Sequence, residues 1–223
     1  MDVKRVAIFG GTGFCGYWMR KTQPLDIKGS YFGRADYERG EWKQVKWDYI
    51  VFLPHIAPTD ALSLAVRHGC RLLYASSGAA YEQQTEYANN KRKWEIECLE
   101  SGADIVIARL FTFFGKHLDK HKAYTVFTEQ ARMNKPLVIS GDGNTTRSYM
   151  HGREMAKYLW LILLRGARGE IYDVGSTVPT TMLELANKII KRELSNSEII
   201  IEDGTDPAPY YMPFDMDKTK QLL

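Results

Sequence analysis

Short apolar runs alternate along the chain with longer segments whose apolar residues recur at helical spacing. The apolar runs predict strands over residues 4–9, 27–32, 48–53, 71–76, 104–110 and 170–175. Helical spacing predicts helices over residues 12–21, 58–68, 86–100, 124–133, 152–165 and 181–192. Strands this apolar leave neither face of a sheet exposed, so the alternation predicts an α/β protein with a doubly wound parallel sheet.

A glycine-rich turn separates the first strand from the first helix. Gly10, Gly13 and Gly16 follow the spacing GxxGxxG. Gly10 permits the tight turn, Gly13 lets the backbone approach a pyrophosphate at the helix N-terminus, and Gly16 lets the helix pack close to the sheet. We therefore predict a dinucleotide site at these glycines with Thr12 and Phe14. The alternative is a plain turn between a strand and a helix.

The end of the second strand bears on which dinucleotide binds. A carboxylate there would bond the adenosine ribose, whereas an arginine favours a 2′-phosphate. Arg34 follows the strand and favours NADP, while Asp36, two residues on, suits NAD. Arg34 can equally be a solvated surface residue, so both cofactors stay open.

Tyr87 and Lys91 lie four residues apart at the start of the helix 86–100, so their side chains share one face, which Glu95 extends. A lysine about 4 Å from a phenol favours the phenolate by roughly 4 kcal/mol at an effective dielectric near 20. That interaction would bring the tyrosine pKa from about 10 to near neutral. We predict that Tyr87 acts as a general acid or base.

Ser77 follows the strand 71–76 and so lies at its carboxyl end, where a doubly wound sheet binds its ligand. We expect its hydroxyl to bond the reacting oxygen. Ser76 and Tyr81 are predicted to be structural, and a lone loop histidine such as His55 is not predicted to be catalytic. The competing interpretation is a chance YxxxK spacing behind a strand that merely ends in serines.

Composition excludes several classes of protein. Thirty Lys and Arg against 27 Asp and Glu give a formal charge of +3 with no basic block, which argues against nucleic-acid binding. Three widely spaced cysteines suit neither a disulfide framework nor a zinc site, so we predict no metal and a cytoplasmic location. The apolar run at residues 159–164 is too short to span a membrane, and we expect a soluble, unprocessed protein.

Six segments in a fixed order resemble the extended short-chain dehydrogenase/reductases, the NAD-dependent nucleotide-sugar epimerase/dehydratase family. They read "GGTGFCG", "YASSGAAY", "YANNK", "ARLFTFFG", "GDGNTTRSYMHGREMAKYL" and "YDVGSTVPTTMLELA". The resemblance spans nearly the whole chain and implies a Rossmann-like fold, NAD or NADP as cofactor, a nucleotide-sugar substrate and a homodimer. It also implies that Ser77 and Tyr87 carry a proton relay, that Lys91 binds the nicotinamide ribose, and that Arg147 contacts the substrate diphosphate.

The resemblance further implies a division of the chain. We expect residues 1–110 to form the dinucleotide-binding core, and residues 111–223 to complete the sheet and form a small substrate-binding lobe. Residues 111–150 are loosely patterned, and loops there are expected to close over a ligand at the carboxyl edge of the sheet.

The chain departs from the family pattern in several places. Gly78 and Ala79 replace the acidic residues that dehydratases and decarboxylases place after the serine, so we expect hydride transfer at a ring carbon, C4, by an epimerase or a ketoreductase. Thr112 replaces an asparagine near the substrate phosphates. One strand–helix unit is missing after the second strand, and the loop between Ser77 and Tyr87 is short. These losses keep open a catalytically silent dinucleotide-binding sensor or scaffold.

Overall fold

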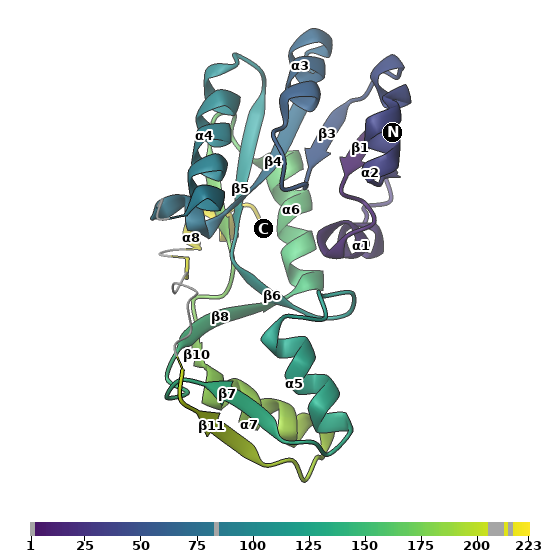
Figure 1. Ribbon diagram of the computed structural model, residues 1–223. Coiled ribbons are helices and arrows are strands. Elements are labelled where there is room, and N and C mark those ends of the chain that lie inside the picture. Colours follow the sequence, from purple (N-terminus) through teal and green to yellow (C-terminus); the bar gives the residue numbers. More distant parts are fainter. Residues whose placement is uncertain (1–2, 83–84, 205–211, 214–215) are drawn as a thin grey trace.

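A six-stranded parallel sheet forms the centre of the computed structural model, which describes residues 3–82, 85–204, 212–213 and 216–223 (Figure 1). The strand order across the sheet is β2-β1-β3-β4-β5-β9. The bounds along the chain are β1 (Lys4–Phe9), β2 (Ile27–Phe32), β3 (Tyr49–Phe52), β4 (Arg71–Ser77), β5 (Ile105–Leu110) and β9 (Ile171–Val174). All neighbouring pairs in this sheet are parallel.

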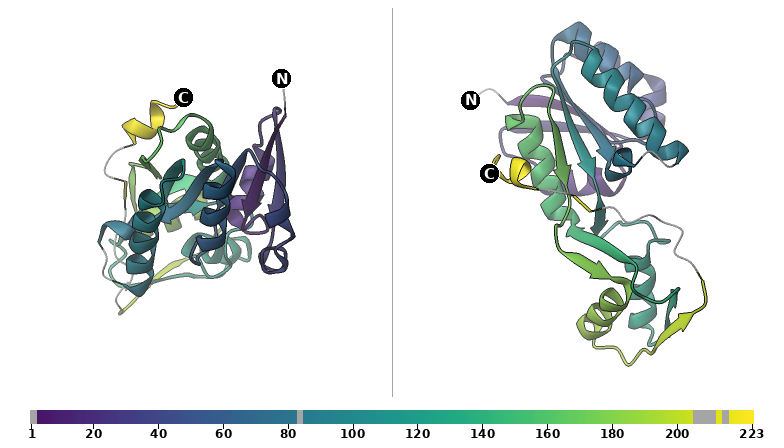
Figure 2. Two further views of the ribbon diagram at one scale, coloured as in Figure 1. Left: turned by 90° about the horizontal axis from the view of Figure 1, so that it is seen from above. Right: turned by 90° about the vertical axis from the view of Figure 1, so that its left-hand side faces the viewer.

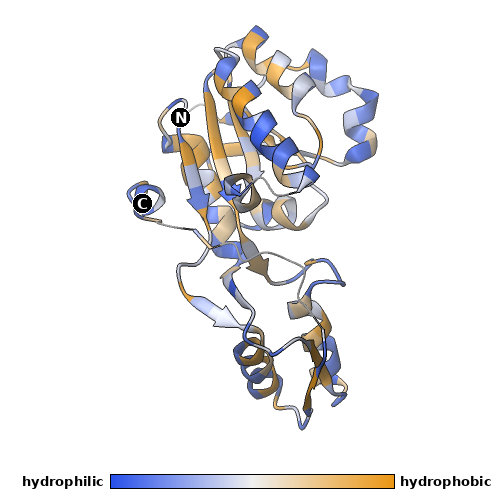
Figure 3. Ribbon diagram, turned by 60° about the vertical axis from the view of Figure 1, so that its left-hand side comes forward, coloured by the Kyte–Doolittle hydropathy of each residue, from blue (hydrophilic) through white to orange (hydrophobic). Residues whose placement is uncertain are grey.

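Helices cover both faces of this sheet (Figure 2). On one face α1 (Phe14–Lys21) and α6 (Gly152–Arg165) enclose the larger apolar core, and the indole Nε1 of Trp160 donates to the Met19 carbonyl at 3.1 Å. On the other face lie α3 (Thr59–His68) and α4 (Glu86–Glu100). The strands of the central sheet are mostly hydrophobic, whereas the helices carry both hydrophobic and hydrophilic residues (Figure 3). The predicted doubly wound α/β fold is confirmed.

The sheet ends at β2, because only two short helical turns connect β2 to β3. These are α2 (Arg34–Arg39) and the 3-10 helix η1 (Glu41–Gln44). Aromatic side chains fill the space beside this edge. The Trp42 ring lies edge-on to Phe9 with 4.5 Å between centroids and stacks on Tyr37 at 5.3 Å. The predicted loss of a strand–helix unit therefore leaves a short connection with its own buried aromatic cluster.

A smaller lobe lies beyond the carboxyl edge of the sheet (Figures 1 and 2). It contains a three-stranded sheet and a two-stranded sheet, and α5 (Ala123–Arg132) and α7 (Met182–Glu193) share a small apolar core with the latter. The strands are β6 (Thr112–Phe114), β7 (Leu137–Ser140), β8 (Thr146–His151), β10 (Pro179–Thr181) and β11 (Ile199–Glu202). A final helix, α8 (Asp217–Lys220), returns to the core beside β9.

The loosely patterned residues 111–150 contain β6, β7 and β8 besides α5, and the sequence analysis did not predict these three strands. These strands are short and pair with distant segments, such as β7 with β11, so local periodicity does not reveal them. The C-terminal half of the chain contributes α6 and β9 to the core as well as the lobe. Among the described residues, no helix has both the length and the apolar character to cross a membrane.

We predict that Trp42→Ala lowers the free energy of unfolding by about 3–5 kcal/mol, the usual cost of truncating a buried tryptophan. Trp42 is 2% exposed and contacts the aromatic rings that cover the end of the sheet. Urea unfolding followed by circular dichroism measures the change. Leu25→Ala, which alters a fully exposed side chain, is the control and should stay within about 0.5 kcal/mol of wild type. Equal effects of both variants would contradict the role of the aromatic cluster.

Candidate active site

The glycine turn between β1 and α1 is built from bare backbone. Gly10 has φ +79, which favours glycine. A Cβ atom at Gly16 would lie 2.4 Å from the Cα of Gly11, so the helix approaches the turn as closely as glycine allows. Gly11 also lies too close to β2 for a side chain, since a Cβ atom there would be 2.7 Å from the Cβ of Tyr31. The sequence prediction included Gly10, Gly13 and Gly16 but missed Gly11.

This turn fits the diphosphate of a dinucleotide. Gly13 is the N-cap of α1, and no side chain caps the first N–H groups of the helix. A Cβ at Gly13 would meet only the Gly10 carbonyl, at 3.4 Å, so the approach to these N–H groups is open. Bare N–H groups at a helix N-terminus bind phosphate oxygens.

Thr12 and Phe14, also predicted at the cofactor, have different surroundings. The Thr12 methyl group lies 3.2 Å from where a Cβ of Gly33 would be, at the end of β2. Phe14 instead packs inward, with its ring stacked on Phe113 at 6.4 Å between centroids. Only the backbone of Phe14 therefore belongs to the turn, because its side chain is part of the core.

Arg34 and Asp36 both lie in the first turn of α2, but their side chains have different partners. The Asp36 carboxylate accepts a hydrogen bond from the Gly33 N–H at 2.8 Å and pairs with Arg39, so it caps the helix. Arg34 bonds Glu38 at 3.0 Å, and its side chain is 93% exposed. The guanidinium is therefore the group that solvent and ligands can reach at this end of β2.

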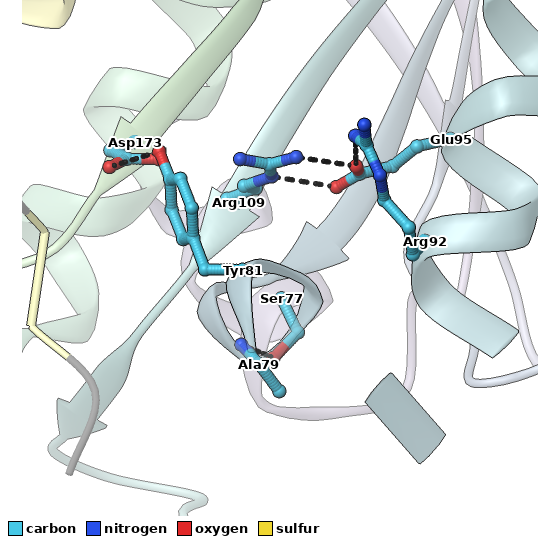
Figure 4. A network of polar contacts seen from close by, with 7 residues as sticks. All are labelled: Ser77, Ala79, Tyr81, Arg92, Glu95, Arg109 and Asp173. Carbon is cyan, nitrogen blue, oxygen red and sulfur yellow. Dashed lines mark hydrogen bonds and ion pairs between the residues drawn. The ribbon is translucent and has the colours of Figure 1, made fainter. Parts of the chain in front are cut away.

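Ser77 and Tyr87 meet at the carboxyl edge of the sheet. Ser77 ends β4, and its Oγ accepts a hydrogen bond from the Ala79 N–H at 3.2 Å (Figure 4). Tyr87 lies in the first turn of α4 and is 41% exposed. Partial burial of the phenol raises the pKa of Tyr87 above its ordinary value, and the nearby Ser77 hydroxyl offsets only part of this rise.

Lys91 does not activate Tyr87 as predicted, and the near-neutral phenol expected from their spacing is wrong. The Lys91 side chain is 1% exposed, and its Nζ donates to the Ala75 carbonyl at 2.9 Å and to the Pro54 carbonyl at 3.5 Å. The ammonium is thus held by main-chain oxygens of β4 and of the loop after β3. Burial lowers the pKa of Lys91 to about 8, because the charged form is poorly solvated there.

Glu95 continues the same helix face but points into the protein. Its carboxylate accepts two hydrogen bonds from Arg109 on β5, at 2.8 and 2.7 Å, and one from Arg92 at 3.1 Å (Figure 4). Burial alone would raise the pKa of Glu95, but the bonds from Arg109 hold it below its usual value. This buried pair ties α4 to the sheet behind the candidate site.

The network continues through Arg109 to the residues that follow Ser77. The Arg109 guanidinium lies 4.1 Å from the ring centroid of Tyr81, which closes the 3-10 helix η2 (Gly78–Tyr81). The Tyr81 hydroxyl donates to the Asp173 carboxylate on β9 at 3.0 and 3.1 Å (Figure 4). Burial raises the pKa of Asp173 to about 6. No local spacing links these residues, so the sequence contained no signal for this network.

Thr112 and Arg147 lie in the three-stranded sheet that leads into the lobe. Thr112 begins β6 and pairs in register with Tyr149 of β8, while Arg147 in the same strand pairs with Thr180 of β10. Arg147 also donates to the Thr146 carbonyl at 2.9 Å. Thr112 and Arg147 therefore lie on the lobe side of the sheet edge, whereas Ser77 and Tyr87 lie on the core side.

His55 lies beside Tyr87, and the sequence prediction did not include it in the site. Its Nδ1 is 3.5 Å from the Tyr87 hydroxyl, and the two rings meet edge to face with 5.7 Å between centroids. Burial lowers the pKa of His55, and the charges of Lys91 and Lys122 lower it further. The sequence feature that could have identified His55 is its position shortly after a buried strand.

The cysteines, Cys15 included, are free thiols, and no cluster of metal ligands occurs within the described ranges.

A protein-family model described as the NAD dependent epimerase/dehydratase family matches residues 54–175, more than half of the 223-residue chain. The chain belongs to this family. The predicted resemblance is therefore confirmed, and the family description names the cofactor that the glycine turn fits.

Curated members of the family are distant in sequence and longer. UDP-glucuronic acid decarboxylase 4 of Arabidopsis thaliana is 25% identical over 193 residues, which cover 75% of this chain and 43% of the relative. Human dTDP-D-glucose 4,6-dehydratase is 28% identical over 134 residues, covering 60% and 36%. The chain thus spans less than half the length of these relatives.

Solved structures of the epimerase/dehydratase type share the fold. UDP-glucose 4-epimerase of Thermotoga maritima, solved with UDP-glucose, has a TM-score of 0.81 at 16% identity, over 97% of this chain and 91% of the other. RMD of Pseudomonas aeruginosa, complexed with NADPH, also has a TM-score of 0.81, at 17% identity over 98% and 92%. dTDP-glucose 4,6-dehydratase of Bacillus anthracis, in complex with NAD, has the same TM-score at 16% identity over 98% and 89%.

We predict that the buried ammonium of Lys91 makes stability depend on pH. The folded-state pKa of about 8 lies below the ordinary 10.5, so the unfolded chain binds the extra proton between these values and stability rises with pH there. The free energy of unfolding of wild type minus that of Lys91→Met should increase by about 3 kcal/mol across this window.

Urea unfolding at pH 8 and at pH 10.5 measures this difference. Lys93→Met is the matched control, because Lys93 lies on the same helix with its side chain 70% exposed, and its difference from wild type should stay constant. A Lys91→Met difference equally independent of pH would show that the ammonium is not buried.

Proposed function

We propose that the protein is an NAD(P)-dependent oxidoreductase that transfers hydride at a ring carbon, C4, of a nucleotide-linked sugar, as an epimerase or a ketoreductase. One observation carries the proposal: a bare glycine turn that fits a diphosphate lies at the same sheet edge as the hydroxyls of Ser77 and Tyr87. Membership of an NAD dependent family supports the cofactor.

Tyr87 is proposed as the general acid and base. Its raised pKa keeps the phenol protonated at neutral pH, so it can donate to a carbonyl oxygen that becomes a hydroxyl and can accept the proton back in the reverse step. Ser77 would orient that oxygen. The bound nicotinamide would supply or accept the hydride.

Lys91 is proposed to hold the nicotinamide ribose. An ammonium group has three N–H donors, and the carbonyls of Ala75 and Pro54 take two of them. The third is available for a ribose hydroxyl. Because the group is buried, its charge acts through a medium of low dielectric and orients the ligand strongly.

Residues after Ser77 support hydride transfer over elimination or decarboxylation. Gly78 carries no acid, and a Cβ atom there would lie 2.4 Å from the Phe111 ring, so an acidic side chain would require that ring to move. Ala79 is buried and has no acid either. The curated relatives named above are a decarboxylase and a dehydratase, and we propose that this chain differs from them at this step.

Arg147 and Thr112 are proposed to bind the substrate diphosphate from the lobe side, and Arg34 to contact the adenosine end of the cofactor. The exposed guanidinium of Arg34 would suit a 2′-phosphate.

The cofactor retained on purification distinguishes epimerisation from ketone reduction. Firmly held NAD supports an epimerase, and uptake of NADPH by the purified protein supports a ketoreductase. We further propose a cytoplasmic homodimer.

A catalytically silent dinucleotide-binding module is the second candidate. It is favoured by the missing strand–helix unit between β2 and β3, by the short loop between Ser77 and Tyr87, and by a tyrosine whose pKa is raised rather than lowered. A change in absorbance at 340 nm that depends on added nucleotide-sugar, or conversion of one sugar epimer into the other, would exclude it.

We predict that Tyr87→Phe lowers turnover at least about 100-fold, the usual contribution of a general acid or base. UDP-glucose and dTDP-glucose are the probes, with NAD or NADPH, and products are resolved by chromatography. Binding of NAD(H), followed by fluorescence, should change little. Tyr49→Phe removes a hydroxyl from the start of β3, at the opposite edge of the sheet, and should leave turnover unchanged. Wild-type turnover in Tyr87→Phe would refute the role of Tyr87.

A further inference from the structure

We propose that His55 is a positioning residue for Tyr87. Its Nδ1 accepts a hydrogen bond from the Tyr87 hydroxyl and sets the pH at which the phenol exchanges its proton. This inference rests on the proposed catalytic role of Tyr87. Its geometric basis is the contact of 3.5 Å between the Tyr87 oxygen and Nδ1 of His55.

The loop that carries His55 is held from two sides. On one side Leu53 and Pro54 pack against the glycine turn, since a Cβ at Gly10 would lie 3.0 Å from the Cβ of Leu53 and 3.6 Å from the Cδ of Pro54. On the other side the Pro54 carbonyl accepts from Nζ of Lys91. The residue that follows Pro54 is therefore placed between the cofactor turn and the start of α4, where Tyr87 lies.

The contact between the rings has the direction that a hydrogen bond needs. The planes of the imidazole and the phenol are inclined at 62°, and the phenol oxygen lies within hydrogen-bond reach of Nδ1. A separation of 3.5 Å is long for a hydrogen bond, and we expect it to shorten when substrate binds.

Other groups near Tyr87 do not offer a proton acceptor at neutral pH. The nearby Ser77 hydroxyl lowers the pKa of Tyr87, and its oxygen already accepts the Ala79 N–H at 3.2 Å. Burial raises the pKa of the Cys15 thiol to about 12, so it stays neutral. The Lys91 ammonium donates to main-chain carbonyls. Among the described residues, the imidazole of His55 is the side chain with a ring nitrogen within hydrogen-bond distance of the Tyr87 hydroxyl.

Charges around His55 favour its neutral form. Although His55 is an exposed residue, partial desolvation lowers its pKa, and the positive charges of Lys91 on α4 and of Lys122 before α5 lower it further. A neutral imidazole with a free Nδ1 carries its proton on Nε2. The two lysines also disfavour an imidazolium, so a proton received from Tyr87 is returned readily.

The proton path balances in both directions of the proposed reaction. In oxidation, the substrate O–H bond breaks as its proton joins the Tyr87 oxygen, while the original phenol proton forms a bond to Nδ1 of His55. The electron pair of the breaking C–H bond would leave as hydride, which an oxidised nicotinamide cofactor would accept when bound. In reduction every one of these transfers is reversed.

Nuclear magnetic resonance of the full cofactor-free chain, labelled with ¹⁵N-histidine, tests the contact without any substrate. We expect His55 to be the Nε2–H tautomer, and we expect Tyr87→Phe to raise the His55 pKa by about half a unit or more, because the lost hydrogen bond stabilised the neutral ring. His55→Asn identifies the resonance. An Nδ1–H tautomer, or a His55 pKa that is the same in Tyr87→Phe, would overturn the proposal.

The pH dependence of kcat/KM tests the consequence, with UDP-glucose and dTDP-glucose as probes. His55→Asn keeps an oxygen acceptor near Tyr87 but does not titrate, so the acidic limb of the profile should disappear and activity at pH 7 should fall at least about tenfold. His68→Asn, in the last turn of α3 at the opposite edge of the sheet, is the control and should keep the limb. An unchanged profile in His55→Asn would also overturn the proposal. Wild-type turnover in Tyr87→Phe would instead mark failure of the proposed function, and the resonance data would still decide the contact.

Discussion

The buried ammonium group of Lys91 joins the core of this protein to its candidate site. A charge removed from water must be matched by oxygen ligands, and here the carbonyls of Ala75 and Pro54 provide them. One carbonyl belongs to the strand that ends at Ser77, and the other to the loop that leads to His55. A single side chain of α4 therefore fixes the relative positions of the strand end, the loop and Tyr87.

The same constraint explains how the proton chemistry is distributed. The Lys91 ammonium donates to main-chain carbonyls, and burial raises the pKa of the neighbouring Tyr87 phenol. The loop that Lys91 holds brings an imidazole to the phenol instead. Behind it the Glu95–Arg109 pair anchors the helix, because a buried carboxylate without such a partner would be costly.

Much of the core could be predicted from the sequence. The strands at residues 4–9 and 27–32 and the helix at 86–100 have the predicted bounds, because long apolar or periodic segments fold locally as their pattern dictates. The glycine turn could also be predicted, because three glycines at this spacing lie between the first strand and the first helix. Short strands such as β6 and β10 were missed, because three residues show no periodicity and their partners lie far along the chain.

By itself the sequence determined the doubly wound sheet, the cofactor turn and the placement of Tyr87 and Lys91 on one helix face, because all of these follow from spacings within a single element. Only the tertiary structure decided where those side chains point. Lys91 contacts Pro54 across a sequence separation of 37 residues. The separation is 32 residues between Tyr87 and His55, and 92 residues between Tyr81 and Asp173. Such partners depend on how strands are ordered in the sheet, and no local periodicity encodes that order.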